Sequence, residues 1–374
     1  MATLLVMAWV ARKEGDRRGQ EAAREAVAEV SRVPFQQLPL AVERLETMRT
    51  LVNPLLQQAI QTSDIGSEER LRLTLAMLPN EPLLAGDVAS QLLKSDAKRI
   101  GVLLESLQPH AKQIDDSLWQ DAEKGDEQTL LPAAAALARF ASDSPRWEGI
   151  AASVSEALAS QDPEVLGDWL PYLDSANQQL VPRLLQIGLS PPGSGQPDRR
   201  VAATKALERY AANDFETLHQ IIVEGQPWQF SQCFDEYEKF RDQAIQLLSV
   251  EVAKQAWIPG EALLVEKVDN TPGGFVKDLF QTYGKFYRSG YKQVVDDASD
   301  LIRKRIVVND LMEDDLLPFI RKQAIQAVAL MRLGKMQPVN DFLNVDTDPG
   351  AISYFVDVAK GRMDRPDDLM QAIA

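Results

Sequence analysis

Residues 200–211 read RVAATKALERYA, and the second half of this stretch returns elsewhere in the chain. Its copies are ALERYA at 206–211, ALARFA at 136–141 and ALMRLG at 329–334, with a weaker TLAMLP at 74–79. Self-similarity of this kind is typical of repeat proteins, in which each unit buries its apolar face against its neighbours rather than in one central core. The sequence therefore predicts an array of stacked repeats.

The motif has the spacing of a helix with one buried face. Ala203, Ala206, Leu207 and Tyr210 stand at i, i+3, i+4 and i+7. Small residues in this stripe let a second helix approach closely. The residues that define the repeat are thus predicted to lie in the core: Ala136, Leu137, Phe140, Ala206, Leu207, Tyr210, Ala329, Leu330 and Leu333.

An arginine follows the stripe in each copy, at Arg139, Arg209 and Arg332. We interpret it as a surface side chain whose apolar stem lies along the helix, with an ordered ligand contact as the alternative.

Composition favours helices and limits the partners. The chain has 374 residues, 45% of them hydrophobic and 7% aromatic. Leucine and alanine dominate the apolar positions and alternating β-branched runs are scarce, which predicts an all-α protein. A net charge of −15 argues against nucleic acid or anionic lipid as a partner of the whole chain, because phosphate binding needs a basic face. A basic protein is the partner that this charge favours.

Metal and cofactor sites are not predicted. Cys233 is the one cysteine, so no internal disulfide and no thiolate zinc site can form, and His110 and His219 are too far apart in sequence to suggest a ligand pair. We expect Cys233 to be a buried structural thiol. The chain lacks the G-x-S-x-G, H-E-x-x-H and kinase signatures, so no catalytic residue is assigned.

The amino terminus, residues 1–19, joins an apolar run to a basic flank. Residues 2–11 read ATLLVMAWVA, and four basic residues follow between Arg12 and Arg18. Ten residues are half of the roughly 20 that a spanning helix needs. A secretory signal would carry its positive charges before the apolar run. We interpret the run as the second half of a transmembrane helix, with a frayed amphipathic helix start as the alternative.

Residues 20–256 are predicted to form helical repeats. Two helices are expected from Gln20 to Thr62, the second with one apolar face made of Leu40, Leu45, Met48, Leu51 and Leu55. Four short helices are expected near 68–79, 83–94, 97–108 and 111–124, and the same pattern returns at 130–189 and 199–252. The motif leucines Leu75, Leu137 and Leu207 are 62 and 70 residues apart, so that each period holds two helix hairpins.

Helix starts are expected where an acid precedes a proline, because the acid caps the helix and proline fits its first position. The clearest pairs are Asp162-Pro163 and Asp348-Pro349. Residues 188–197, GLSPPGSGQP, are predicted to be a loop; they lack the lysine and hydroxyl ending of a phosphate-binding loop.

The repeat pattern of apolar residues is interrupted at 257–310, which we interpret as an irregular insertion or a degenerate repeat. The pattern resumes at 311–374, which we expect to be a truncated C-terminal HEAT-like repeat. The insertion contains the one basic and aromatic run of the chain. Such a run is what a phosphate or single-stranded nucleic-acid groove uses, but it is short and lies in an acidic chain, so we interpret it as a packed insertion with a binding groove as the alternative. The interaction patch predicted here consists of Tyr283, Lys285, Phe286, Tyr287, Arg288, Tyr291 and Lys292.

Acidic clusters offer the second functional class, an enzyme with a metal- or carboxylate-based site. Residues 344–350, NVDTDPG, resemble the opening of a calcium loop, but Pro349 stands where glycine is needed and Phe355 where the bidentate glutamate is needed. The acid runs at Asp296-Asp297 and 313–315 could serve acid–base chemistry only if a cleft brought them together.

Residues 200–211 resemble the second helix of a HEAT repeat, R-x-x-A-x-x-A-L-x-x-hydrophobic-Ala/Gly; the copies at 136 and 329 keep its A-L half. The resemblance implies a HEAT-like α-solenoid of stacked helix hairpins, preceded by a partial transmembrane or apolar helix.

A longer resemblance joins the apolar segment with its basic flank to 67–78, 136–141 and 321–334. This order is similar to the linker region of planctomycete-type bacterial proteins that carry a eukaryotic-like serine/threonine kinase domain, a membrane helix, HEAT-like repeats and often a formylglycine-generating, sulfatase-modifying-factor-like domain. The resemblance implies a non-catalytic protein-binding scaffold or sensor region of a membrane-anchored signalling protein, without cofactor. The basic flank favours the cytoplasmic side and the family order favours the extracytoplasmic side, which we prefer.

Overall fold

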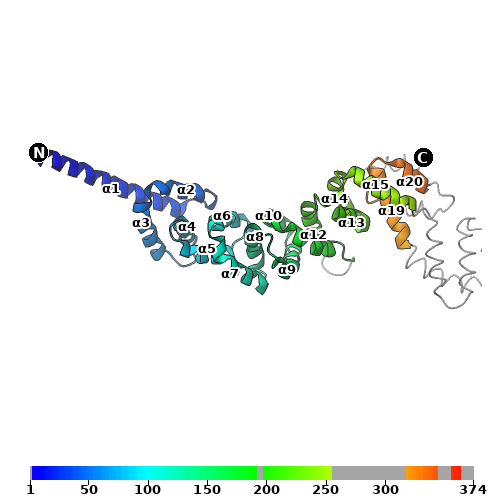
Figure 1. The fold of residues 1–374 in the computed structure, drawn as a ribbon, viewed down its shortest axis with the longest axis horizontal. Helices are drawn as coiled ribbons and strands as arrows, with labels where there is room; N and C mark the ends of the chain where they lie inside the picture. The colour runs from blue at the N-terminus through cyan, green and yellow to red at the C-terminus, as the bar shows by residue number, and fades with distance from the viewer. Residues whose placement is uncertain (1, 192–196, 255–316, 344–354, 364–374) are drawn as a thin grey trace, which may run out of the picture. The chain divides into compact units, whose positions relative to one another are not determined.

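The computed structural model describes residues 2–191, 197–254, 317–343 and 355–363, and every regular element within them is a helix (Figure 1). The prediction of an all-α chain of stacked helices is confirmed for these residues. The interaction patch predicted at 283–292 lies outside them, as do Asp348-Pro349 and the acid runs. The chain divides into two compact units, Met1–Ile187 with Pro192–Ala206, and Gly188–Pro191 with Leu207–Ala374.

The first unit begins with a long helix, α1 (Ala2–Arg32), which runs through the apolar stretch and its basic flank without a break. Among the residues of α1 whose burial the structure describes, Ala23 is the first that is buried, and helices α2 and α3 pack on α1. In the described parts of the chain, no helix has both the length and the apolar composition that a membrane crossing requires. The interpretation of residues 2–11 as half of a span stays a prediction.

The expected apolar stripe between Gln20 and Thr62 is wrong. This region holds α1, α2 (Leu38–Leu45) and α3 (Arg49–Thr62), with a 3-10 turn at 46–48 that rotates α3 relative to α2. Leu40 is 61% exposed although Leu45 on the same helix is buried, because two residues five apart face different sides of one helix. Leu51, on α3, is 40% exposed because the turn shifts the helical register between α2 and α3. The residues that these two helices bury are Leu38, Ala41, Leu45, Val52 and Leu56.

The four-helix pattern that follows is confirmed. Helix hairpins recur in each predicted window, and short 3-10 turns precede or follow several of the helices. The α-helices are α4 (Glu68–Met77), α5 (Ala85–Leu92), α6 (Ala97–Leu107), α7 (Ala111–Lys124), α8 (Leu130–Phe140), α9 (Trp147–Ala159), α10 (Pro163–Leu173), α11 (Asn177–Gly188), α12 (Pro197–Tyr210), α13 (Phe215–Glu224), α14 (Pro227–Glu238), α15 (Arg241–Lys254), α19 (Leu317–Arg332) and α20 (Met336–Leu343). The 3-10 turns are η1 (Phe35–Gln37), η2 (Glu46–Met48), η3 (Pro82–Leu84), η4 (Gln108–His110) and η5 (Asp174–Ala176).

The motif of the repeat lies on α4, α8, α12 and α19. The predicted core positions are buried on all three full copies, except that Phe140 is only half-buried at the end of its helix. The prediction of a single buried face is wrong for α8, in which every residue from Leu130 to Ala138 is buried. Helices α6, α7, α9 and α10 all pack on α8, so its alanines meet a neighbour on each side. Helix α8 is therefore the centre of its group.

Two of the three motif arginines fit the surface interpretation. Arg139 and Arg209 are exposed. Arg332 differs, because its guanidinium carbon lies 3.9 Å from the ring centroid of Phe234.

Aspartate side chains cap α10 and α6, and the cap of α10 is the Asp162-Pro163 pair expected from the sequence. Asp162 accepts from the N–H of Glu164 at 2.9 Å with Pro163 as the first residue of α10, and Asp96 caps α6 by accepting from the N–H of Arg99 at 3.1 Å. Each cap satisfies an N–H that the helix leaves unpaired.

Arginines bind the carboxyl ends of neighbouring helices. Arg49 donates to the carbonyl of Ala76 at 2.6 Å, and Arg70 donates to that of Ile60 at 3.1 Å. A cation at a helix carboxyl end satisfies an unpaired carbonyl and complements the helix dipole. Each of these arginines therefore links its own helix to the carboxyl end of the other, so that α3 and α4 are joined twice.

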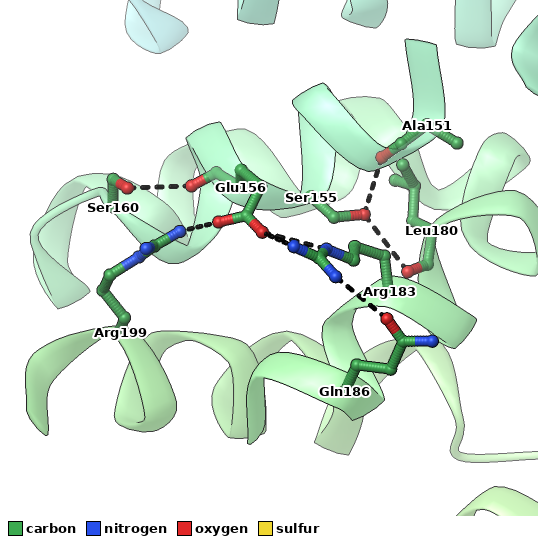
Figure 2. A network of polar contacts seen from close by, with 8 residues as sticks. All are labelled: Ala151, Ser155, Glu156, Ser160, Leu180, Arg183, Gln186 and Arg199. Atoms are coloured by element: carbon green, nitrogen blue, oxygen red, sulfur yellow. Dashed lines mark hydrogen bonds and ion pairs between the residues drawn. The ribbon is translucent and has the colours of Figure 1, made fainter. Parts of the chain in front are cut away.

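A polar network joins α9, α11 and α12 (Figure 2). Glu156 on α9 receives both Arg183 on α11 and Arg199 on α12, and Arg183 also donates to Gln186 at 2.9 Å. The buried hydroxyl of Ser155 donates to carbonyls in the same place. Because each member of this network has a partner that fixes a helix, its role is structural.

The second unit packs aromatic side chains around two arginines. Phe230 and Phe234 of α14 stack with centroids 5.2 Å apart, and the guanidinium of Arg332 lies over Phe234. Arg362 is 2% exposed; it donates to the carbonyl of Gly225 at 3.0 Å, and its own carbonyl accepts from Arg332 at 3.1 Å. Among the described residues, Arg362 has no carboxylate partner. The residues at 355–363 are thus tied to the end of α13.

Candidate functional site

The described part of the first unit has an open cleft of about 420 Å³ formed by α6, α8 and α10, which lie together in Figure 1. Helices α6 and α10 lie side by side and both pack on α8. Small residues keep the cleft open, and polar side chains from all three helices reach it. The lining residues are Ala97, Lys98, Arg139, Gly167, Asp168, Pro171 and Tyr172.

The close approach of α6 and α10 depends on a glycine. A Cβ at Gly101 on α6 would lie 3.0 Å from the hydroxyl oxygen of Tyr172 on α10, tighter than almost all real contacts. Glycine inside a helix is unfavourable, so one at such a position indicates that another group comes close. Gly101 thereby positions Tyr172 at the edge of the cleft.

The polar groups of the cleft have few partners. Within the described residues, Lys98, Asp168 and Tyr172 make no side-chain hydrogen bond or ion pair, and Arg139 donates only to the neutral Gln108, at 2.8 and 3.2 Å. Burying or pairing such groups on a ligand would add interactions that the free chain does not make. The cleft therefore offers three donor side chains and one carboxylate to a ligand.

The backbone of α10 adds an acceptor. Pro171 lies inside the helix and has no N–H, so it cannot donate to the carbonyl of Gly167 four residues earlier. Both residues line the cleft. An extended segment of a ligand could donate a backbone N–H here.

Cys233 and Tyr237 lie in the interior of the second unit, away from this cleft in sequence and by element. Burial raises the pKa of the Cys233 thiol to about 12, with Glu208 and Glu236 adding to the effect, and burial also raises the pKa of Tyr237. The hydroxyl of Tyr237 lies 2.9 Å from Nδ1 of His219, whose pKa is lowered by burial and by Lys322. A thiol held neutral is not a nucleophile at neutral pH. The expectation that the Cys233 thiol is buried is confirmed.

We expect Cys233 to resist alkylation in the folded chain and to react once the chain unfolds. At pH 8 the folded thiol stays protonated, whereas an unfolded cysteine is partly thiolate. By the same linkage, stability falls as the pH rises above the unfolded pKa of about 8.5, because the unfolded state then releases a proton that the folded state keeps. Mass spectrometry after iodoacetamide, with and without urea, measures this; rapid labelling of the native chain would contradict it.

Searching the described residues for a metal centre gives no group of three or more histidine, cysteine, aspartate or glutamate side chains. The residues of the cleft were not among those singled out from the sequence, apart from Arg139. The signal that could have found them is the pair of glycines, Gly101 and Gly167, inside two amphipathic helices.

Comparison with protein-family models, with curated proteins and with solved structures finds no match to this chain.

Proposed function

We propose that this chain is a non-catalytic, protein-binding region of a membrane-anchored bacterial signalling protein, built of HEAT-like helix hairpins. The observation that carries the proposal is the cleft over α8. Among the described residues, its side chains Lys98, Asp168 and Tyr172 make no hydrogen bond or ion pair and Arg139 donates only to the neutral Gln108, whereas Glu156, Arg183 and Arg362 hold helices together. Unpaired polar groups around an open cleft are what a protein ligand can satisfy.

The HEAT-like assignment rests on the order of packing. Helix α5 packs on α7 and α7 on α9, while α6 packs on α8 and α8 on α10, so that each hairpin contacts the next one along the chain; α6 also reaches α10, one hairpin further. Nearest-neighbour packing of this kind is typical of solenoids, which present extended surfaces to partners. The periods of 62 and 70 residues support the same assignment.

The test is a selection of peptides from a random library displayed on phage, with the full-length chain as bait. We expect peptides that bind saturably with one site per chain, measured by titration calorimetry. A parallel selection on an unrelated helical protein sets the background. Enrichment no greater than this background would contradict the proposal.

Metal analysis tests the non-catalytic part separately. A stoichiometric metal ion that the purified chain retains through chelation would contradict it, because coordinated metal indicates a built site.

We expect the chain to bind neutral lipid vesicles weakly through its amino terminus. The apolar run 2–11 has about half the length of a membrane span, so it can enter the interface without crossing the bilayer. Replacing Leu4, Leu5 and Val6 together by glutamine should abolish binding to phosphatidylcholine vesicles. Co-sedimentation with the vesicles compares the unaltered chain with the triple variant. If both sedimented to the same extent, the membrane assignment would be contradicted.

A further inference from the structure

We infer that the cleft over α8 binds an acidic segment of a partner protein, with Lys98 and Arg139 receiving an aspartate or glutamate side chain. The inference rests on the proposed function and specifies the chemistry of the partner at this site.

The charge of the cleft carries the argument. Its lining holds two cations, Lys98 and Arg139, and one acid, Asp168, in a chain whose net charge is −15. The cleft lining thus carries a net positive charge although the chain as a whole is strongly negative.

The two cations keep their charge available. In the described part of the chain Lys98 has no ion-pair partner, and the guanidinium of Arg139 is oriented by the neutral oxygen of Gln108 rather than neutralised by a carboxylate. Other arginines of the first unit differ in this respect: Arg146 and Arg183 each form an ion pair with a glutamate of the chain. Hydrogen bonds from a cation to a carboxylate are stronger than those between neutral groups.

The remaining groups fit an extended peptide. The hydroxyl of Tyr172 can donate to a backbone carbonyl, and the carbonyl of Gly167, which Pro171 cannot serve, can accept a backbone N–H. Val165, three residues before Asp168 on α10 and outside the cleft lining, is 44% exposed and offers an apolar contact on the same side of the helix. Asp168 disfavours a second acid next to the first, so it restricts the spacing of charge along the peptide.

Glutamine substitutions test the inference on the peptides selected by the full-length chain. Lys98→Gln should weaken binding about threefold and the double variant Lys98→Gln, Arg139→Gln about tenfold, in the range for exposed charge pairs. Asp168→Asn should strengthen it about twofold, because it removes a repulsion. Lys112→Gln is the matched control, since Lys112 is an exposed lysine on α7 outside the cleft, and it should leave the affinity unchanged.

The composition of the selected peptides gives the second readout. We expect enrichment of aspartate and glutamate, which the net charge of the chain would by itself select against. Selected peptides that are basic, or that bind the double variant as well as the wild type, would overturn the inference and leave the binding function standing. A selection without any specific binder would overturn both.

Discussion

Leu137→Ala should lower the free energy of unfolding of the first unit by about 2 to 5 kcal/mol. Leu137 is 0% exposed on α8, the helix on which α6, α7, α9 and α10 all pack. Removing its side chain leaves a cavity that four helices cannot close without moving. Urea unfolding followed by circular dichroism measures the loss as a lower midpoint.

Leu83→Ala is the matched control for this change. Leu83 is 92% exposed, so the same atoms are removed without a cavity, and the free energy of unfolding should change by less than about 0.5 kcal/mol. Equal effects of the two substitutions would contradict the central position of α8.

Arg362→Ala should destabilise the second unit by about 3 kcal/mol. The substitution leaves the carbonyl of Gly225 without its donor and removes a buried side chain that packs over Phe230. Burial, with the positive charge of Arg321, lowers the pKa of Arg362 to about 10, because burial disfavours the charged guanidinium. Arg362→Met, which removes the charge and keeps the stem, should therefore be less harmful than Arg362→Ala, at about 1 kcal/mol.

Arg321→Ala is the control in the same unit. Arg321 is exposed and its positive charge helps to lower the pKa of Arg362, so its removal should be neutral or slightly stabilising. Thermal unfolding compares the three variants. If Arg362→Ala were no worse than Arg321→Ala, the contact between 355–363 and the end of α13 would not contribute to stability.

The order of the helices from α4 to α15 could be predicted from sequence because local signals agree there. The stripe Ile100, Leu103, Leu104 and Leu107 is buried as its spacing indicates, and Asp162 caps α10 with Pro163 in place. The register of α2 and α3 could not be predicted in the same way, since the turn at 46–48 interrupts the helical count without a proline or glycine to mark it.

The features that could not be predicted from the sequence pattern depend on how the helices pack in three dimensions. The complete burial of α8 depends on which helices surround it, and an alanine-rich helix carries no sign of whether one face or all faces meet a neighbour. The cleft combines Lys98, Arg139 and Asp168 from three helices, so no spacing along the chain brings them together. Arg362 meets Gly225 across 137 residues.

The most direct measurement of a protein-binding cleft over α8 is amide hydrogen exchange of the full-length chain with and without its tightest library peptide. The account predicts slower exchange in α6 and α10, at the residues near Lys98 and Asp168, and unchanged exchange in α14 and α15 of the second unit. Protection confined to helices outside the cleft, with α6 and α10 unaffected, would contradict the account.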